Sequence, residues 1–451
     1  MLKLTIWRAA ITGPQAKKFW NAVEAVPSEY TRALTPAREA MANALGLSDA
    51  GEGTVPERAG RNNSIVRAEM FHRQDETYVL AQRSRRKGPA WNHFEDNEEE
   101  IPVSQSAKNE PGHIYLYVLS GERGVPDISE FETAVKDAMG VELLRWNYEA
   151  NRFMELKKEG RQEALELTEE KVAASRLLCE KEARTLATAI KSSLGGLILS
   201  DVERQLKHDK ITDLEGALDK LQYSGLIAAE YVVVCAKNNN QVARFGDMRV
   251  IEEMSKKGVR CGCGRKLEDE RREEAVTVTD FGRKLLDKST WMSVVLVDEL
   301  RAVGVSDDRI MIEYSSGGDE MDCIADINGE LVLFELKDKE FSLREAYSFG
   351  AKISLVRPRH PVIVTTERVG GDAKEHFQKA QIAGASRGIF SNSDEAKPIR
   401  FIEGIDSLRA GIEGLASSVH RADTFRILRD VMPLAAISSN QLLDKFTTDS
   451  A

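Results

Sequence analysis

The segment from Gly318 to Phe341 constrains the fold more than any other part of this sequence, because it contains the pattern of a hairpin. Two apolar runs, Cys323–Ala325 and Leu331–Phe334, are separated by Asn328-Gly329. Asn-Gly between apolar runs is the strongest short-range signal for a β-hairpin turn. We therefore expect two adjacent antiparallel strands, the second of which ends in Glu335-Leu336-Lys337.

The predicted hairpin brings acidic side chains together. With the turn at residues 328–329, Asp322 lies opposite Glu335, and Lys337 shares the face of Glu335 because side chains alternate along a strand. Glu320 shares the face of Asp322. Like charges directly opposite each other destabilise a sheet, so this pair indicates a bound cation. Carboxylate oxygens suit Mg²⁺ or Mn²⁺.

An Asp on one strand followed by Glu-x-Lys on the next resembles the active site of the PD-(D/E)XK nuclease superfamily, the fold of many restriction enzymes. The resemblance implies that Asp322, Glu335 and Lys337 are catalytic. It also implies that Asp322 and Glu335 bind the metal with the Leu336 carbonyl, and that Lys337 orients or activates the attacking water. Glu320 is a further candidate ligand. Such a metal lowers the pKa of its bound water and neutralises phosphoryl oxygens.

The segments around the hairpin favour this interpretation over an exposed hairpin with a solvated ladder of charges. The two strands are continuously apolar, which is typical of buried strands. A helix is predicted before them at 290–303 and another after them at 342–355, followed by a strand at 361–366. This order matches the core of the superfamily, and a motif in its expected context is stronger than the motif alone.

Thr290-Trp291-Met292, the hairpin and the Glu-x-Lys strand together resemble the nuclease half of CRISPR-ancillary proteins that join a cyclic-oligonucleotide sensor to a nuclease. That family often carries an acidic residue just after the Trp of the first helix, where this chain has Ser293. The departure leaves two alternatives, a weaker metal site or a site in which Glu320 replaces the missing acid.

A winged helix is predicted upstream. Ser200 is expected to cap a helix that ends near 207, and Thr212 a second helix that ends at Tyr223, before a strand at 230–234. The second helix carries three acidic groups and one basic group, Lys220, a net charge of −2. Because acidic groups oppose contact with phosphates, we expect it to couple domains or dimerise the chain rather than read DNA.

Three cysteines follow at spacings that resemble a zinc ribbon. They are Cys235, Cys261 and Cys263, and Asn238 stands where a fourth cysteine would be. Because structural zinc takes four nitrogen or sulfur ligands, two alternatives stay open: a ribbon that holds one Zn²⁺ through these cysteines, or a degenerate ribbon that folds without metal.

The first part of the chain is less informative. Helices are expected at 15–26, 35–44 and 128–139, and strands at 77–81 and 113–119, without a glycine-rich phosphate loop or a Rossmann pattern. The sensor half of the family named above is therefore not supported there, and a partner protein or a small ligand is a candidate for binding. The basic run at 83–87 precedes an acidic run at 95–100, so we favour a solvated loop over a phosphate contact.

The segment from 143 to 192 is charged and helical in pattern, and Leu165, Val172, Cys179 and Leu186 recur every seven residues within it. This repeat predicts an amphipathic helix, which Gly160 interrupts. It either packs on a neighbouring element or forms a short coiled coil in a homodimer. At the other end of the chain, two helices are expected at 405–418 and 424–434.

The predicted fold is a multidomain α/β chain. Its parts are an N-terminal α+β domain (1–145), a helical connector (146–192), a winged helix with a zinc-ribbon-like insert (193–288), a restriction-endonuclease-like core (289–404) and C-terminal helices (405–451). The predicted function is a Mg²⁺- or Mn²⁺-dependent endonuclease that acts on DNA, in antiviral defence or DNA processing. The alternative is a nuclease-fold protein that binds nucleic acid or regulates a process without cutting.

Charge and composition limit the partners. The net charge of −10 argues against a general nucleic-acid coat protein, although a local basic channel suffices for a nuclease. Arg357 and Arg359 precede the last predicted core strand and are candidates for nucleic-acid contact. The first thirty residues contain basic groups and no apolar core stretch, so we expect no signal peptide, and no apolar run is long enough to predict a membrane span. The odd number of cysteines, 5, is typical of a cytoplasmic protein.

Overall fold

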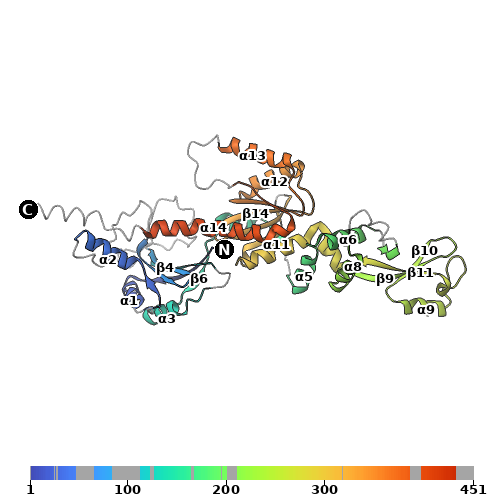
Figure 1. Ribbon diagram of the computed structural model, residues 1–451, viewed down its shortest axis with the longest axis horizontal. Coiled ribbons are helices and arrows are strands. Elements are labelled where there is room, and N and C mark those ends of the chain that lie inside the picture. The colour runs from blue at the N-terminus through green and yellow to red at the C-terminus, as the bar shows by residue number, and fades with distance from the viewer. Residues whose placement is uncertain are drawn as a thin grey trace, which may run out of the picture.

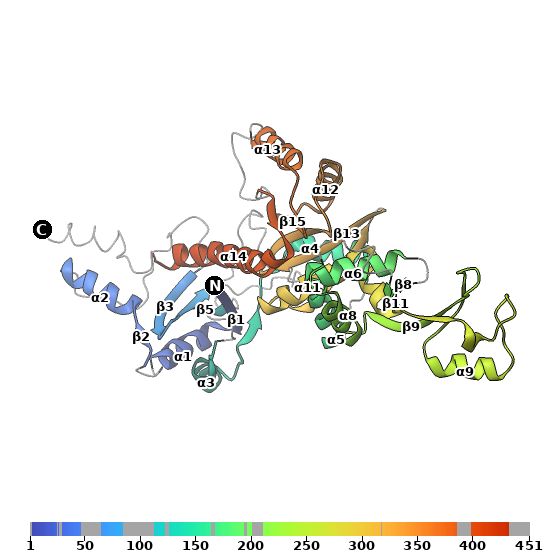
Figure 2. The ribbon, with the colours of Figure 1, turned by 45° about the vertical axis from the view of Figure 1, so that its right-hand side comes forward.

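The computed structural model describes residues 2–24, 26, 29–46, 65–83, 112–121, 126–163, 167–193, 196–200, 211–316, 318–385 and 398–432. Within them the strands form three sheets along an elongated molecule, and the sheet that contains β13, β14 and β15 lies between the other two (Figure 1, Figure 2). No helix among these residues has both the length and the apolar character that a membrane span needs. The charged runs at 84–87 and 95–100, the expected helix at 201–207 and the polar tail from 438 lie outside the described residues.

The first sheet is antiparallel throughout, with strand order β2-β3-β4-β5-β1-β6. Its strands are β1 (Lys3–Ile11), β2 (Thr31–Arg32), β3 (Ile65–Arg73), β4 (Glu76–Arg83), β5 (Gly112–Ser120) and β6 (Leu144–Trp146). Helices α1 (Gly13–Val23) and α3 (Ser129–Met139) cover one face, and α2 (Leu34–Ala44) adds Leu34 to the other. The expected helices and strands of this part are confirmed, and the antiparallel pairing excludes a Rossmann sheet among the described strands.

The prediction of one amphipathic helix between 143 and 192 is wrong. The segment instead forms α4 (Asn151–Glu159), strand β7 (Arg161–Glu163), α5 (Glu169–Leu177) and α6 (Lys181–Ser192). Glu180 has an extended backbone and separates α5 from α6. Val172 and Leu186 therefore lie on different helices, and the repeat does not form one continuous apolar stripe. Gly160 does end α4, and a Cβ there would lie 2.3 Å from the ring of Tyr314.

The second sheet has strand order β10-β9-β11-β8. Its strands are β8 (Leu197–Ile198), β9 (Ile227–Val234), β10 (Gln241–Phe245) and β11 (Arg271–Val278), and helix α8 (Leu214–Tyr223) packs with α6 above it. Asp213, rather than Thr212, caps α8, because its Oδ1 accepts the Gly216 N–H at 2.9 Å. The Thr212 hydroxyl instead donates to Glu182. Between β9 and β11 the chain forms α9 (Met248–Lys256) and the short helix η1 (Leu267–Asp269).

The third sheet contains the predicted hairpin and has strand order β16-β15-β14-β13-β12-β7. Its other strands are β12 (Ile310–Ser316), β13 (Asp319–Ile327), β14 (Glu330–Lys337), β15 (His360–Thr365) and β16 (Arg400–Glu403). The β13–β14 register follows the sequence prediction, since Cys323 pairs with Phe334 and Ile327 with Glu330. Asn328 and Gly329 both have positive φ, 50° and 86°, as a type I′ turn requires. Strands β15 and β16 continue the sheet in parallel.

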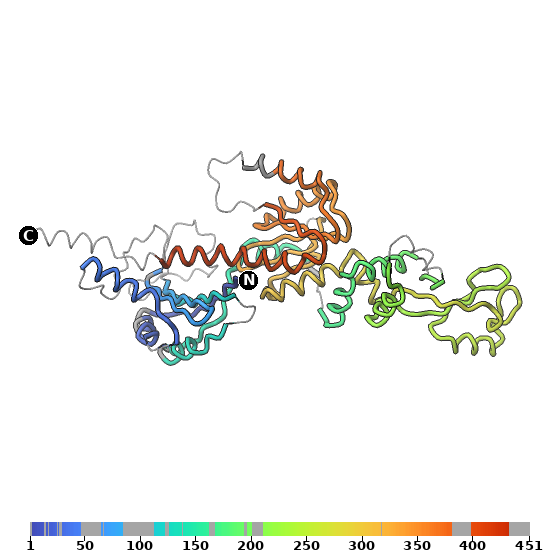
Figure 3. The backbone as a smooth tube through the Cα atoms, in the orientation of Figure 1, coloured from blue at the N-terminus to red at the C-terminus, as the bar shows by residue number. Residues whose placement is uncertain are grey.

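Helices cover both faces of the third sheet, so that it forms the middle of three layers. Helix α11 (Thr290–Ala302), which follows α10 (Asp280–Leu286), and the first half of α14 (Leu408–Val431) lie on one side. Helices α4, α12 (Leu343–Val356) and α13 (Gly371–Ala385) lie on the other. The two helices expected near the C-terminus are one continuous helix, α14, which runs from this sheet to the first (Figure 3). Its Ile427 and Val431 pack on the first sheet.

Candidate active site and candidate metal centre

The structure brings Asp322, Glu335 and Lys337 together at the end of β14. The Leu336 N–H donates to Asp322 Oδ2 at 2.6 Å, which ties the two strands beyond their last paired residues. Lys337 Nζ lies 2.9 Å from Glu335 Oε1 and 3.8 Å from Asp322 Oδ2. Glu335 is only 2% exposed, so its charge must be balanced by groups inside the protein.

A second lysine, which was not among the predicted site residues, reaches the same carboxylates. Lys352 Nζ lies 2.7 Å from Glu335 Oε2 and 4.0 Å from Asp322 Oδ1. It extends from α12, on the face that buries Phe349 and Val356. A single lysine three residues after one buried position and four before another is a sequence signal for an inward-facing charge. Its partner could not be identified without the position of α12 over the sheet.

The two carboxylates and two lysines form a compact charge cluster in which Glu335 is buried and Asp322 and Lys337 are partly exposed. Burial, and then the neighbouring Glu335, raise the pKa of Asp322 to about 6, and both lysines oppose this shift. Burial acts to lower the pKa of Lys337, but Asp322 and Glu335 outweigh it and raise that pKa above its ordinary value. The adjacent carboxylates of Asp322 and Glu335 offer the hard oxygen ligands that Mg²⁺ and Mn²⁺ take.

Glu320 lies near the site but is not joined to this cluster. Its Oε1 accepts from Lys288 Nζ at 2.9 Å. A residue that the sequence did not reveal, Glu313 of β12, lies between it and Asp322: burial, followed by a hydrogen bond to Glu320 and the charge of Asp322, raises its pKa to about 7. Ser293, which stands where the family that the sequence motif resembles often has an acid, donates its hydroxyl to Glu313 Oε1 at 3.4 Å.

The backbone explains why Glu313 was not predicted. Its φ is 43°, an uncommon value for a residue with a side chain, and the pairing of β12 with β7 is irregular between Ile312 and Ser315. The usual alternation of side chains between the two faces of a strand therefore does not predict on which face of β12 the Glu313 side chain lies. Glu313 supplies a carboxylate near the position that Ser293 leaves without one.

The structure does not bring Arg357 and Arg359 to the carboxylates. The Arg359 N–H donates to the Leu331 carbonyl at 2.8 Å, and His360 pairs with Val332, so both arginines lie where β14 begins. Glu335 is four residues further along this strand, which is roughly 13 Å at 3.3 Å per residue. A nucleic-acid contact at these arginines stays a prediction.

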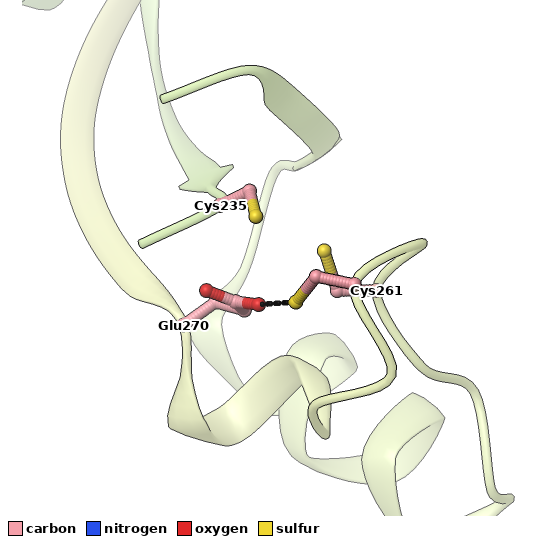
Figure 4. Close-up of side chains that lie close together, drawn as sticks. Cys235, Cys261 and Glu270 are labelled. Atoms are coloured by element: carbon pink, nitrogen blue, oxygen red, sulfur yellow. Dashed lines mark hydrogen bonds between the residues drawn. The ribbon is translucent and has the colours of Figure 1, made fainter. Parts of the chain in front are cut away.

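A second group of possible ligands lies at the base of the insert between β9 and β11. Cys235, Cys261, Cys263 and Glu270 each offer one ligand atom, and these atoms all lie within 4.8 Å of one another (Figure 4). The four residues could hold a metal ion. Glu270, rather than the residue at position 238, is the fourth member of this group. Asn238, which stands where a fourth cysteine of a zinc ribbon would be, uses its Oδ1 to accept the Asn240 N–H at 3.1 Å.

Comparison with known proteins adds little. No family model matches the chain, and no curated protein matches it. Among solved structures, the crystal structure of protein VC1899 from Vibrio cholerae is similar at 12% identity and a TM-score of 0.31. The match covers 58% of this chain and 58% of that one, so the chain spans little more than half of that protein. A likeness of this strength carries no argument about fold or function.

Proposed function

We propose that this chain is a metal-dependent nuclease of the PD-(D/E)XK type that hydrolyses phosphodiester bonds in DNA. The convergence of Asp322, Glu335 and Lys337 at one end of a buried hairpin carries the proposal. The order of the sheet supports it, because a helix precedes the hairpin and a helix and parallel strand follow it. A cytoplasmic role in antiviral defence or DNA processing is part of the proposal, by analogy with the family.

The donor set fits a divalent cation. Asp322 and Glu335, with the Leu336 carbonyl, would hold Mg²⁺ or Mn²⁺, and Glu313 and Glu320 lie on the side towards α11. When bound, such a cation lowers the pKa of a water molecule and neutralises charge on the phosphate. Lys337 would donate to the attacking water or to a phosphate oxygen. Lys352 would hold Glu335 in place through its 2.7 Å contact.

The parts of the chain outside the third sheet would connect domains or bind partners and would take no part in hydrolysis. Helices α6 and α8 with the second sheet have the helix and strand order of a winged helix, but α8 carries acidic groups, and its Lys220 pairs with Glu180 at 2.7 Å. A domain-coupling or dimerising role suits such a surface better than contact with phosphates. The first sheet, which α14 joins to the third, would bind a partner protein or a small ligand.

A non-cleaving nuclease-fold protein is the second candidate function. Two observations favour it. Ser293 stands where the family that the motif resembles often has an acid. The ammonium groups of Lys337 and Lys352 together already balance the charges of the two carboxylates. In that case the domain would bind nucleic acid or a partner without hydrolysis.

Plasmid cleavage distinguishes the two functions. We expect the full chain to nick or cut plasmid DNA with Mg²⁺ or Mn²⁺, and Lys337→Ala to lose roughly 10²-fold or more of this activity, as members of a catalytic unit usually do. Lys339→Ala is the matched control, because that side chain is 67% exposed and its ion pair within the described part of the chain is with Glu345, away from the two carboxylates. Cleavage by Lys337→Ala at the unchanged rate, or none by the unchanged protein with either metal, would count against the proposal.

A further inference from the structure

The insert between β9 and β11 comprises residues 235–270, and its two ends meet at its base. Val234 of β9 pairs with Arg271 of β11, and the next positions along this antiparallel ladder are Cys235 and Glu270. The sulfur of one strand end therefore lies beside the carboxylate of the other. Cys261 and Cys263 return from the far side of the insert to meet them, and the Cys263 thiol donates to Glu270 Oε1 at 2.9 Å (Figure 4).

Backbone N–H groups point at these ligand atoms. The N–H groups of Lys237 and Asn238 donate to the Cys235 sulfur, and that of Cys263 donates to the Cys261 sulfur. The Ala236 N–H donates to Glu270 Oε2 at 2.6 Å. Such donors stabilise thiolates and a carboxylate, and they orient these groups in the way that outer partners orient the ligands of a metal.

The insert has too small an apolar core to hold its shape alone. Its cluster contains three buried residues, Val233, Ile251 and Leu267, with a few partly buried neighbours. Chain segments below about 40 residues need disulfides, metals or oligomerisation to fold stably. All five cysteines are free thiols in the structure, so the insert has no disulfide to supply that constraint.

We propose that Cys235, Cys261, Cys263 and Glu270 form a four-ligand Zn²⁺ site that holds the insert against the β9–β11 hairpin. A tetrahedral Zn²⁺ with bonds of about 2.3 Å needs ligand atoms about 3.8 Å apart. The observed group, within 4.8 Å, requires little adjustment. Three thiolates select zinc over Mg²⁺ and Ca²⁺, and the carboxylate completes the set.

The site is independent of the proposed nuclease centre. Figure 1 places β10 and α9 at one end of the molecule and β14 near its middle, and Figure 2 shows α9 at the same end with β13 near the middle. All four positions are filled by protein, which is typical of structural zinc, whereas catalytic zinc keeps an open position. The zinc would therefore fix the shape of the insert and take no part in hydrolysis.

Metal content and cobalt substitution test the proposal on the full chain. We expect protein purified reduced and without chelator to hold about one zinc per chain, as a single tetrahedral site requires. Replacing that zinc with Co²⁺ should give the thiolate charge-transfer and tetrahedral d–d bands. Cys261→Ser should lose both signals, whereas the matched control Cys179→Ser should keep them, because Cys179 lies outside the group.

The role of Glu270 separates this site from a three-cysteine ribbon. Glu270→Ala should release zinc to a chelator at least about tenfold faster, a loss that even outer partners of a metal can cause. Glu270→Cys should release it more slowly and keep the cobalt spectrum. Absence of zinc and of the cobalt bands in the unchanged protein would overturn the proposal, even where a cysteine variant fails to fold. Equal release rates for Glu270→Ala and the unchanged protein would overturn the role of Glu270.

Discussion

Replacing Lys352 with methionine tests the carboxylate site as a metal site without depending on cleavage. The ammonium lies 2.7 Å from Glu335 Oε2 and 4.0 Å from Asp322 Oδ1. At an effective dielectric constant of about 20, the shorter contact alone is worth about 6 kcal/mol before desolvation. Removing one partner of a buried pair costs about 3–5 kcal/mol, and we expect about 3 kcal/mol because Lys337 remains beside Glu335.

A divalent cation should reverse most of this loss. Methionine keeps the aliphatic length of the lysine but removes the charge that repels a cation from Glu335 and Asp322. A ligand at about 100 times its Kd stabilises the folded state by about 2.7 kcal/mol. We therefore expect Mg²⁺ or Mn²⁺ to raise the Tm of Lys352→Met by more than it raises the Tm of the unchanged protein.

Scanning calorimetry with and without Mg²⁺ or Mn²⁺ measures this difference, at a constant low zinc concentration so that the cysteine group stays in one state. Lys339→Met is the control, since its exposed pair with Glu345 at 3.0 Å should contribute less than about 1 kcal/mol. If the metal shifts the Tm of all three proteins equally, or shifts none of them, the carboxylates do not bind a cation and the reasoning is refuted.

Three further outcomes are expected. Because burial and Glu335 raise the pKa of Asp322 to about 6, its ionisation costs stability above that pH, and this cost should disappear from the metal-free protein as the pH falls from about 7 to 4. The pKa of Glu313 is also raised and acts in the same direction, so calorimetry should show that Asp322→Asn gains less stability over this range than the unchanged protein. Gly329→Ala should lower the Tm, since its φ is 86° and a Cβ would lie 2.6 Å from Tyr148, whereas Gly350→Ala, with no atom within 4 Å, should not. In metal-free binding assays at two salt concentrations, Lys220→Glu should change little, whereas Arg357→Ala with Arg359→Ala should lower the salt slope by about two; the opposite result would make α8 the DNA-binding element.

The hairpin could be predicted because its determinants are local. Asn328-Gly329 specifies the turn, the turn sets the register, and the register puts Asp322 beside Glu335. The same local reasoning failed between 143 and 192, because a repeat of seven residues does not reveal that Glu180 is extended. Periodicity reports which positions are apolar, and it does not report where a helix stops.

The residues that sequence reasoning missed all depend on long-range placement. Lys352 needs α12 laid over β14, and Glu313 needs an unusual backbone angle. Glu270 needs the register of β11 on β9, which the insert separates in sequence. In each case the residue type was ordinary and its partner was distant in the sequence, so no spacing rule could have identified that partner, even for Lys352, whose spacing does indicate an inward-facing charge.

The hairpin is held at both ends, which explains how it can keep a charged site in place. At the turn, Asn328 Nδ2 donates to Asp423 of α14 at 2.6 Å, and Gly329 packs against Tyr148. At the other end, Lys337 and Lys352 hold the carboxylates. Between these ends both strands are buried on both faces. Helix α14 also packs on the first sheet. A structural change in the first sheet that moved α14 would therefore act on the hairpin turn through Asp423, and the rigid pair of strands would connect the turn to Glu335.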